Sequence, residues 1–175
     1  MDLVKFIRTV PDFPIKGINF YDVTTLFENI TTFNYIIKLL FERYKSEKID
    51  KVVGIEARGF MLGAALAYKL NVGFVPIRKK GKLPYKTISE TYSLEYGEDT
   101  VEIHIDAIQK NQNILLVDDL IATGGTANAS TKLINNLDGI IKECCFIIDL
   151  PELGGSNDLK LNGLNVFSIL SLEEK

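Results

Sequence analysis

Short apolar runs alternate with longer amphipathic segments along most of this 175-residue chain. Four runs are almost wholly apolar, as strands covered on both faces are: residues 51–55, 73–77, 113–117 and 144–148. Three segments carry apolar residues at helical spacing: 32–46, 60–70 and 126–137. A further apolar stretch at 164–170 is expected to complete the sheet. The pattern predicts an α/β fold in which a mostly parallel, twisted central sheet is flanked by helices on both faces.

Two regions interrupt this alternation. Residues 10–27 contain two prolines and a short aromatic piece, and predict a small N-terminal hood over about residues 1–30 that caps one edge of the sheet. Residues 78–97 are basic and then polar with little periodicity, and irregular loops of that length are usually functional. Residues 101–105 alternate with period two, which predicts a half-exposed edge strand. No repeat or linker divides the chain, so we expect one domain over residues 1–175.

Composition excludes several classes of partner. The chain has 20 basic and 23 acidic residues and a formal net charge of −3, so we expect no nucleic acid or anionic membrane as a partner. We also expect neither a signal peptide nor a membrane span. The only two cysteines, Cys144 and Cys145, are adjacent, which suits neither an ordinary disulfide nor a metal site. These features predict core cysteines and a reducing, cytoplasmic location.

The strongest chemical signal is the segment 114–126, ILLVDDLIATGGT. A buried strand ends in Asp118 and Asp119, at the sheet edge where ligands bind in open α/β folds. A small-residue turn and a helix follow, and their backbone N–H groups can hold a phosphate: Ala122, Thr123, Gly124, Gly125 and Thr126. The alternative is that Asp119 solvates a turn and Thr126 caps a helix without a ligand. Neither a P-loop nor a dinucleotide fingerprint is present, so a phosphate cup beside two acids indicates a phosphorylated sugar.

This segment resembles the signature of the type I phosphoribosyltransferases, whose members bind 5-phosphoribosyl-1-pyrophosphate (PRPP). Four more motifs resemble, in order and spacing, the adenine-using branch of that family: residues 10–20, 54–60, 75–84 and 92–97. The resemblance implies the type I phosphoribosyltransferase fold and conversion of adenine and PRPP to AMP and pyrophosphate in purine salvage. It also implies a homodimer, and Mg²⁺ bound mainly through PRPP or pyrophosphate with no protein metal ligand.

The same resemblance assigns roles to individual residues. Asp118 and Asp119 would bind the ribose hydroxyls, and residues 122–126 the 5′-phosphate. A larger set would bind pyrophosphate: Glu56, Ala57, Arg58, Gly59, Arg78, Lys79 and Lys82. Of these, Arg58 would also be catalytic, and the residues matching Arg78, Lys79 and Lys82 often reach the neighbouring subunit's site. Without the resemblance, Arg58 could equally be a surface residue or an anion ligand. The basic segment at residues 78–82 could likewise be a solvated loop.

In the family, residues matching about 78–100 form a flexible lid that excludes water during the reaction. Glu95 would be catalytic and Tyr96 a lid residue, although the two could instead belong to a hairpin stem. The base site would be Asn19, Phe20 and Tyr21, with Phe20 stacked on the purine; a core aromatic is the alternative reading of Phe20. Asn19 and Tyr21 stand where the family commonly has an aliphatic and a basic residue.

Two rival functions remain open at this point. One is transfer to a different base, such as hypoxanthine, guanine or xanthine, which the departures at Asn19 and Tyr21 permit. The other is a regulator that senses PRPP and binds nucleic acid, which would need a basic face or an added DNA-binding segment.

Overall fold

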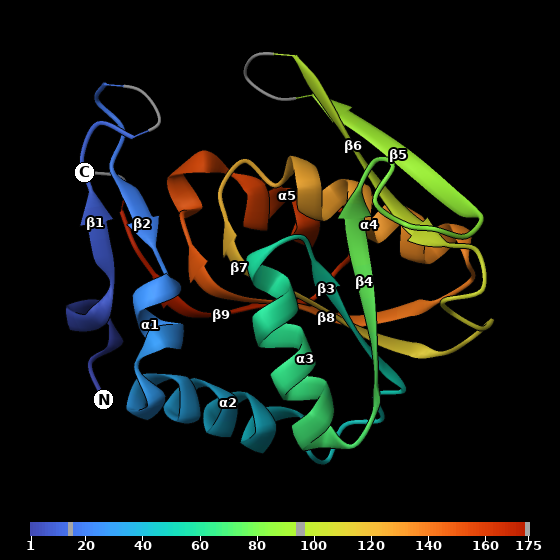
Figure 1. Ribbon diagram of the computed structural model, residues 1–175, viewed down its shortest axis with the longest axis horizontal. Coiled ribbons are helices and arrows are strands. Elements are labelled where there is room, and N and C mark those ends of the chain that lie inside the picture. The colour runs from blue at the N-terminus through green and yellow to red at the C-terminus, as the bar shows by residue number, and fades with distance from the viewer. Residues whose placement is uncertain (14–15, 94–96, 174–175) are drawn as a thin grey trace.

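The computed structural model describes residues 1–13, 16–93 and 97–173 (Figure 1). These residues form a seven-stranded sheet in the order β5-β6-β4-β3-β7-β8-β9 and a separate two-stranded sheet, β1-β2. The strands are β1 Arg8–Val10, β2 Phe20–Asp22, β3 Lys51–Ile55, β4 Gly73–Lys79, β5 Thr87–Ser93, β6 Glu98–His104, β7 Asn113–Ile121, β8 Ile140–Asp149 and β9 Val166–Ser171. The helices are α1 Thr24–Glu28, α2 Ile30–Tyr44, α3 Arg58–Leu70, α4 Gly125–Asn136 and α5 Gly155–Leu161, with short 3₁₀ turns at Leu3–Phe6 and Pro151–Leu153.

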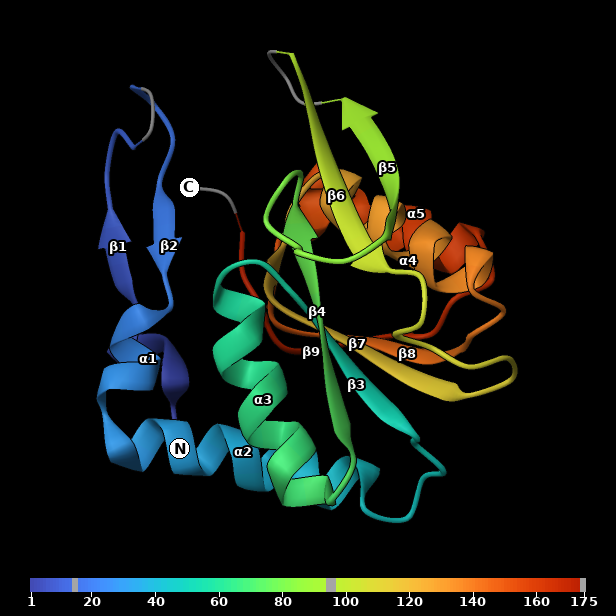
Figure 2. The ribbon, with the colours of Figure 1, turned by 45° about the vertical axis from the view of Figure 1, so that its right-hand side comes forward.

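The predicted fold class is confirmed. Strand β3 pairs in parallel with β4 and β7, and the parallel pairing continues through β8 to β9. Within this described sheet only β6 runs in the opposite direction, and it pairs antiparallel with β4 on one side and with β5 on the other. The helices lie on both faces, with α2 and α3 on one side and α4 and α5 on the other (Figure 2).

Two expectations about the segment after β4 are wrong. The sequence predicts an edge strand at residues 101–105, but β6 lies between β5 and β4. The period-two pattern misleads because Glu102, the charged residue within it, is 9% exposed and accepts a hydrogen bond from the Gly81 N–H at 3.0 Å. The stretch expected to be irregular contains strand β5, which pairs with β6 along its whole length.

Two buried clusters cover the two faces of the sheet, which explains why its central strands are apolar on both sides. One cluster joins the sheet to α4 and α5 through residues such as Leu133, Phe146 and Leu159. The other joins it to α1, α2 and α3 and includes Leu26, Leu40 and Leu62. Cys144 belongs to the first cluster and Cys145 to the second, and burial raises the pKa of each thiol to about 12.

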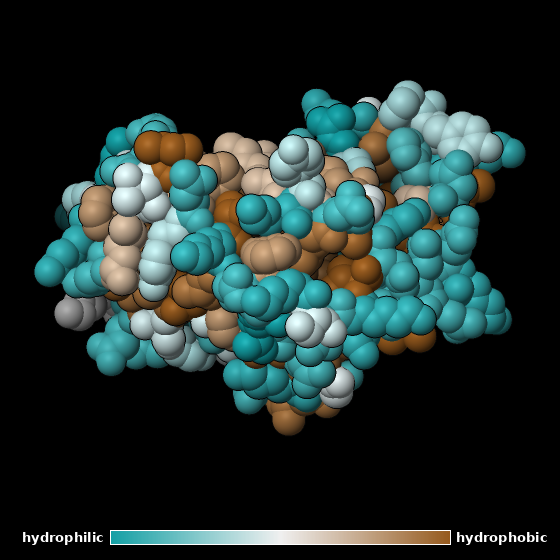
Figure 3. Space-filling model, turned by 90° about the horizontal axis from the view of Figure 1, so that it is seen from below, coloured by the Kyte–Doolittle hydropathy of each residue, from teal (hydrophilic) through white to brown (hydrophobic). Residues whose placement is uncertain are grey.

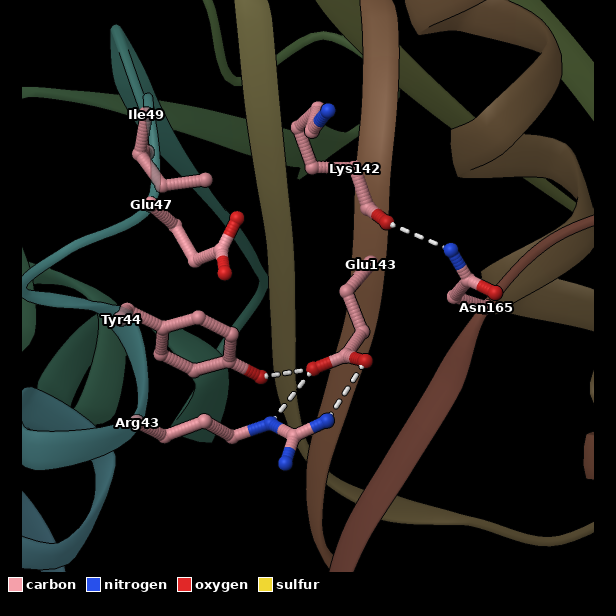
Figure 4. A pocket seen from close by; sticks show the side chains of 7 residues that line it. All are labelled: Arg43, Tyr44, Glu47, Ile49, Lys142, Glu143 and Asn165. Carbon is pink, nitrogen blue, oxygen red and sulfur yellow. Dashed lines mark hydrogen bonds and ion pairs between the residues drawn. The ribbon is translucent and has the colours of Figure 1, made fainter.

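Helix α2 is fixed at both ends. The Asn29 side chain accepts hydrogen bonds from the backbone N–H groups of Thr31 and Thr32, which caps its start. At its end, the Arg43 guanidinium donates twice to the Glu143 carboxylate of β8, at 2.8 Å each, and Tyr44 donates to the same carboxylate at 2.6 Å (Figure 4). The three residues that make these contacts help to line a cavity of about 320 Å³. Because both Glu143 oxygens are already paired, we interpret the cluster as a brace between α2 and the sheet.

The N-terminal hood consists of β1, β2 and α1. Strands β1 and β2 pair antiparallel, and the Thr25 hydroxyl of α1 donates to the Phe6 carbonyl at 2.6 Å. Val23 and Leu26 are fully buried in the cluster that also covers α2 and α3. The hood therefore packs on the body of the molecule through α1, while its two strands project beyond it (Figures 1 and 2).

The outer surface of α2 and α3 carries apolar side chains. A groove of about 520 Å³ between the two helices is lined by residues that include Phe33, Ile37, Phe41 and Tyr68, and Tyr68 is 89% exposed. Seen from below, the molecule shows apolar patches among hydrophilic side chains (Figure 3).

Across the described ranges, no helix combines the length and apolar character that crossing a membrane requires.

Candidate active site

The two aspartates lie at the carboxyl end of the parallel sheet, inside β7 rather than after it, because that strand continues to Ile121. Asp119 accepts a hydrogen bond from Arg58 Nε at 2.5 Å, and its side chain is 7% exposed. Asp118 accepts the Asp119 N–H at 2.9 Å and packs against Gly59, where an added Cβ would lie 2.8 Å from Asp118 Oδ1. Burial, together with the neighbouring Asp119 charge, raises the pKa of Asp118 well above its usual range.

A cavity of about 350 Å³ opens beside this pair and is lined by Glu56, Ala57, Arg58, Lys79, Tyr92, Val101, Asp118, Asp119, Leu120 and Thr126. The lining combines carboxylates and cations that come from the ends of β3, β4 and β7, which parallel pairing brings to one edge of the sheet. A second cavity of about 140 Å³ adjoins it and shares Asp118, Leu120 and Thr126. The structure thus brings most of the predicted site residues together.

The second cavity is formed by the predicted phosphate turn, residues 122–126. Gly124 has φ +81°, a conformation that favours glycine, and α4 begins at the next residue, so the helix N-terminus faces the cavity. The Gly155 N–H donates to the Ala122 carbonyl at 2.9 Å, which packs the start of α5 against the turn. Free N–H groups at a helix start form an anion site, so this turn can hold a phosphate.

The loop from Glu56 to Gly59 connects β3 to α3, and its Glu56–Ala57 peptide is cis. Arg58 extends from the first residue of α3 toward Asp119, and its guanidinium carbon lies 5.5 Å from the centre of the Phe20 ring. Burial alone would lower the pKa of Arg58, but the charge and hydrogen bond of Asp119 outweigh burial and raise it. Arg58 therefore stays charged between the acid pair and the hood.

The predicted cations of β4 are also held by acids. Arg78 Nε lies 3.2 Å from Glu56 Oε2, and its NH1 donates to the Lys82 carbonyl at 3.0 Å. Lys79 Nζ donates to Asp99 at 2.6 Å, while the Lys79 N–H donates to Glu56 at 3.0 Å. The Lys82 side chain is exposed and does not line the described cavity. The Glu56 side chain thus orients the basic segment, whereas the prediction had grouped it with the anion-binding residues.

Two further residues of the site come from the β5–β6 hairpin. Tyr92 lines the cavity, and its hydroxyl lies 3.3 Å from the Asp99 carboxylate that holds Lys79. A hydrogen bond from Lys79 and partial burial act in opposite directions on Asp99, and the net effect lowers its pKa. Tyr92 entered the sequence prediction only as the first residue of the motif at 92–97, and Asp99 was assigned no role. Their one detectable signal was their place within residues 78–100, the segment that the resemblance assigns to a lid.

The three residues predicted to form the base site lie at the start of β2 or just before it. Phe20 packs edge-on against Phe13, with ring centres 5.1 Å apart, and faces Arg58. Asn19 directly precedes β2. The Tyr21 hydroxyl donates to the Glu173 carbonyl at 2.8 Å. Two predicted residues, Glu95 and Tyr96, lie outside the described residues.

The two acids of the site are possible metal ligands. Asp118 and Asp119 offer carboxylate oxygens, the donors that Mg²⁺ prefers. Within residues 1–13, 16–93 and 97–173, no three or more His, Cys, Asp or Glu side chains gather closely enough to hold a metal ion. A magnesium ion at this pair would have to take its other ligands from a substrate or from water.

Known proteins resemble this chain over nearly its whole length. The phosphoribosyl transferase domain family matches residues 22–159. Adenine phosphoribosyltransferase of Methylobacillus flagellatus is 53% identical, over 99% of both chains. The crystal structure of adenine phosphoribosyltransferase from Thermoanaerobacter pseudethanolicus superposes with a TM-score of 0.92 at 46% identity, covering 98% of each chain. That of the Saccharomyces cerevisiae enzyme, complexed with adenine and an imino-altritol bisphosphate, superposes with a TM-score of 0.90 at 40% identity, covering 97% of each chain. The chain therefore belongs to the adenine phosphoribosyltransferase family, whose members are pentosyltransferases.

Proposed function

We propose that this cavity transfers the phosphoribosyl group of PRPP to adenine, giving AMP and pyrophosphate in purine salvage. The observation that carries the proposal is the meeting of an acid pair, Arg58, Lys79 and a glycine-rich helix N-terminus at one sheet edge. The acids suit two ribose hydroxyls, the turn at 122–126 suits the 5′-phosphate, and the cations suit pyrophosphate. The two adjoining cavities would take the 5′-phosphate and the pyrophosphate of PRPP separately.

In the proposed reaction, N9 of adenine attacks C1 of the ribose as the bond from C1 to the pyrophosphate oxygen breaks. The electron pair of that bond leaves with pyrophosphate, the N9 proton is lost, and configuration at C1 inverts. Arg58 would be catalytic because its fixed charge, held by Asp119, stabilises the negative charge that develops on the leaving group. Positioning and charge neutralisation supply most of the catalysis.

The pyrophosphate site would comprise Glu56, Ala57, Arg58, Gly59, Arg78, Lys79 and Lys82. Within the described residues, Arg58, Arg78 and Lys79 each contact a carboxylate: Asp119, Glu56 and Asp99. Pyrophosphate carries several negative charges, and charge-assisted hydrogen bonds to it are strong enough to compete with these partly exposed pairs. Magnesium, when bound, adds positive charge to the pyrophosphate oxygens, and we assign it mainly to substrate ligands with the acid pair beside it.

The remaining assignments belong to the same proposal. The chain would act as one domain, with a hood at about 1–30 and a lid at about 78–100 that brings Glu95 to the base and Tyr96 to the closed site. Phe20 would stack on adenine, between Asn19 and Tyr21. A cytoplasmic homodimer is also proposed, and the apolar side chains on the outer surface of α2 and α3 support association.

A binding experiment tests the proposed ribose site. We expect Asp119→Asn to weaken PRPP binding about tenfold or more in calorimetric titration, because an amide replaces the charged acceptor and releases Arg58; one charge-assisted hydrogen bond is worth about 1.5–3 kcal/mol. Asp106→Asn, a change at an exposed position outside the cavity, is the matched control. Equal PRPP affinity in wild type and both variants would remove Asp119 from the proposed site.

A further inference from the structure

The hood is tied to the C-terminal segment by one long-range hydrogen bond. The Tyr21 hydroxyl of β2 donates to the carbonyl of Glu173, 152 residues further along the chain, at 2.8 Å. One residue earlier, the Leu172 N–H donates to the Asp149 carbonyl at the end of β8, at 3.0 Å. The end of β9 approaches β2 in both ribbon views (Figures 1 and 2). A continuous connection therefore runs from the hood to the central sheet.

Strand β2 is short, and its last residue is also held: the Asp22 carboxylate pairs with Arg8 and accepts hydrogen bonds from Thr24. The strand has three residues, and its described strand partner is the three-residue β1, whose first two residues are exposed. Successive side chains of a strand point to opposite faces. Phe20 faces Arg58 on one side, while Tyr21 reaches the C-terminal segment on the other. A contact that fixes Tyr21 therefore also fixes the position of the Phe20 ring.

Tyr21 and Leu172 also pack against the same part of the core. Both pack at the margin of the buried cluster that holds the α1, α2 and α3 side of the sheet. The Tyr21 ring and the C-terminal segment are therefore anchored on the same buried cluster.

We propose that Tyr21 is a positioning residue for the acceptor base, because its bond to Glu173 couples the C-terminal segment to the hood and holds Phe20 in place opposite Arg58. The inference rests on the proposed function, in which Phe20 stacks on adenine. It gives Tyr21 a different part from the one suggested by its place in the base-binding motif: the side chain acts through Phe20. It also gives the last residues of the chain a part in base affinity.

The test is a double-mutant cycle between Tyr21→Phe and deletion of residues 173–175. Tyr21→Phe keeps the ring and removes only the hydroxyl, so folding is preserved. We expect it to raise the KM for adenine about two- to tenfold, the range of one ordinary hydrogen bond, with kcat and the KM for PRPP within about twofold of wild type. The deletion should have a similar effect, and the double variant should be no worse than either single one. Tyr35→Phe, which removes a hydroxyl from α2 at the margin of the same buried cluster, is the matched control and should match wild type.

The outcomes separate this inference from the proposed function. Phe20→Ala is measured in parallel and should raise the KM for adenine more than Tyr21→Phe does. If Phe20→Ala raises it and Tyr21→Phe does not, the coupling is wrong and the base site stands. If the effects of Tyr21→Phe and the deletion add, Tyr21 acts independently of the C-terminal segment and the inference is overturned. If Phe20→Ala leaves the KM unchanged, the proposed base site is wrong and the inference fails with it.

Discussion

The phosphate turn offers a sharp test, because one of its glycines has no room for a side chain. At Gly124, where φ is +81°, an added Cβ would lie 2.7 Å from the Gly155 Cα and 3.2 Å from the Gly155 carbonyl oxygen. Both atoms belong to the backbone at the start of α5, so a flexible side chain cannot move aside to relieve the contact. We therefore expect Gly124→Ala to displace the turn at 122–126 relative to α5.

The size of the effect can be separated into two parts. Placing alanine in the left-handed region costs about 1–2 kcal/mol of folding free energy. Gly163 has nearly the same φ, +80°, and a Cβ added there meets no described atom within 4 Å, so Gly163→Ala carries the backbone cost alone. The further loss in Gly124→Ala measures the clash with Gly155. If displacement of the turn removes one charge-assisted hydrogen bond to the 5′-phosphate, affinity falls by about 1.5–3 kcal/mol, or one to two decades.

The assay combines urea unfolding of both variants with the KM for PRPP and calorimetric titration of AMP. Gly163→Ala should lose stability but keep the wild-type KM and AMP affinity. Gly124→Ala should lose more stability, raise the KM for PRPP at least about tenfold and weaken AMP binding alongside. If the two variants had equal stability and equal AMP affinity, the assignment of this turn to the 5′-phosphate would be refuted.

Three other predictions concern single residues. Asp118→Asn should reduce kcat/KM for PRPP yet raise thermal stability at pH 7. The raised pKa of Asp118 means that the folded protein binds this proton more tightly than the unfolded chain does, so the wild type loses stability as pH rises. The stability advantage of the variant should therefore vanish below about pH 4, where Asp118 is protonated in both the folded and the unfolded state. A thermal melting series from pH 4 to 8 measures this, and a constant difference across that range would contradict it. Glu143→Gln should lower stability by about 1–2 kcal/mol with unchanged kinetics, because it weakens the brace between Arg43 and β8, and an unchanged melting temperature would argue against the brace. Glu95→Gln should lower kcat far more than PRPP affinity, as expected of a lid residue that acts once both substrates are bound; a wild-type kcat would leave Glu95 in a stem role.

The parts of the fold that the sequence predicts are those with a strong local signal. Apolar runs long enough to be buried on both faces identified β3, β4, β7 and β8, and small residues after an acid pair identified the turn before α4. Helix α5 was not predicted, because a seven-residue helix offers too few turns for helical periodicity to emerge. Strand β5 was missed because its polar residues suit a hairpin that projects beyond the sheet.

The contacts of the site were less predictable than its residues. Motifs placed Arg58 and Asp119 at the same edge of the sheet, but their ion pair joins residues 61 positions apart and depends on how α3 packs on β7. The same holds for Asp99, which reaches Lys79 only because β6 runs antiparallel beside β4. Tyr21 shows the limit most clearly, since its partner is a backbone carbonyl near the other end of the chain. A backbone group carries no residue-type signal that a motif could capture.

The central claim is that this site joins adenine to the phosphoribosyl group of PRPP, and pyrophosphate release with different acceptor bases tests it most directly. The purified protein is supplied with PRPP, magnesium and, in separate reactions, adenine, hypoxanthine or guanine. The account predicts stoichiometric AMP and pyrophosphate with adenine and a kcat/KM for adenine well above that for either 6-oxopurine. Efficient use of hypoxanthine or guanine with little use of adenine would contradict the base assignment, and no pyrophosphate release with any base would contradict the assignment of the whole site.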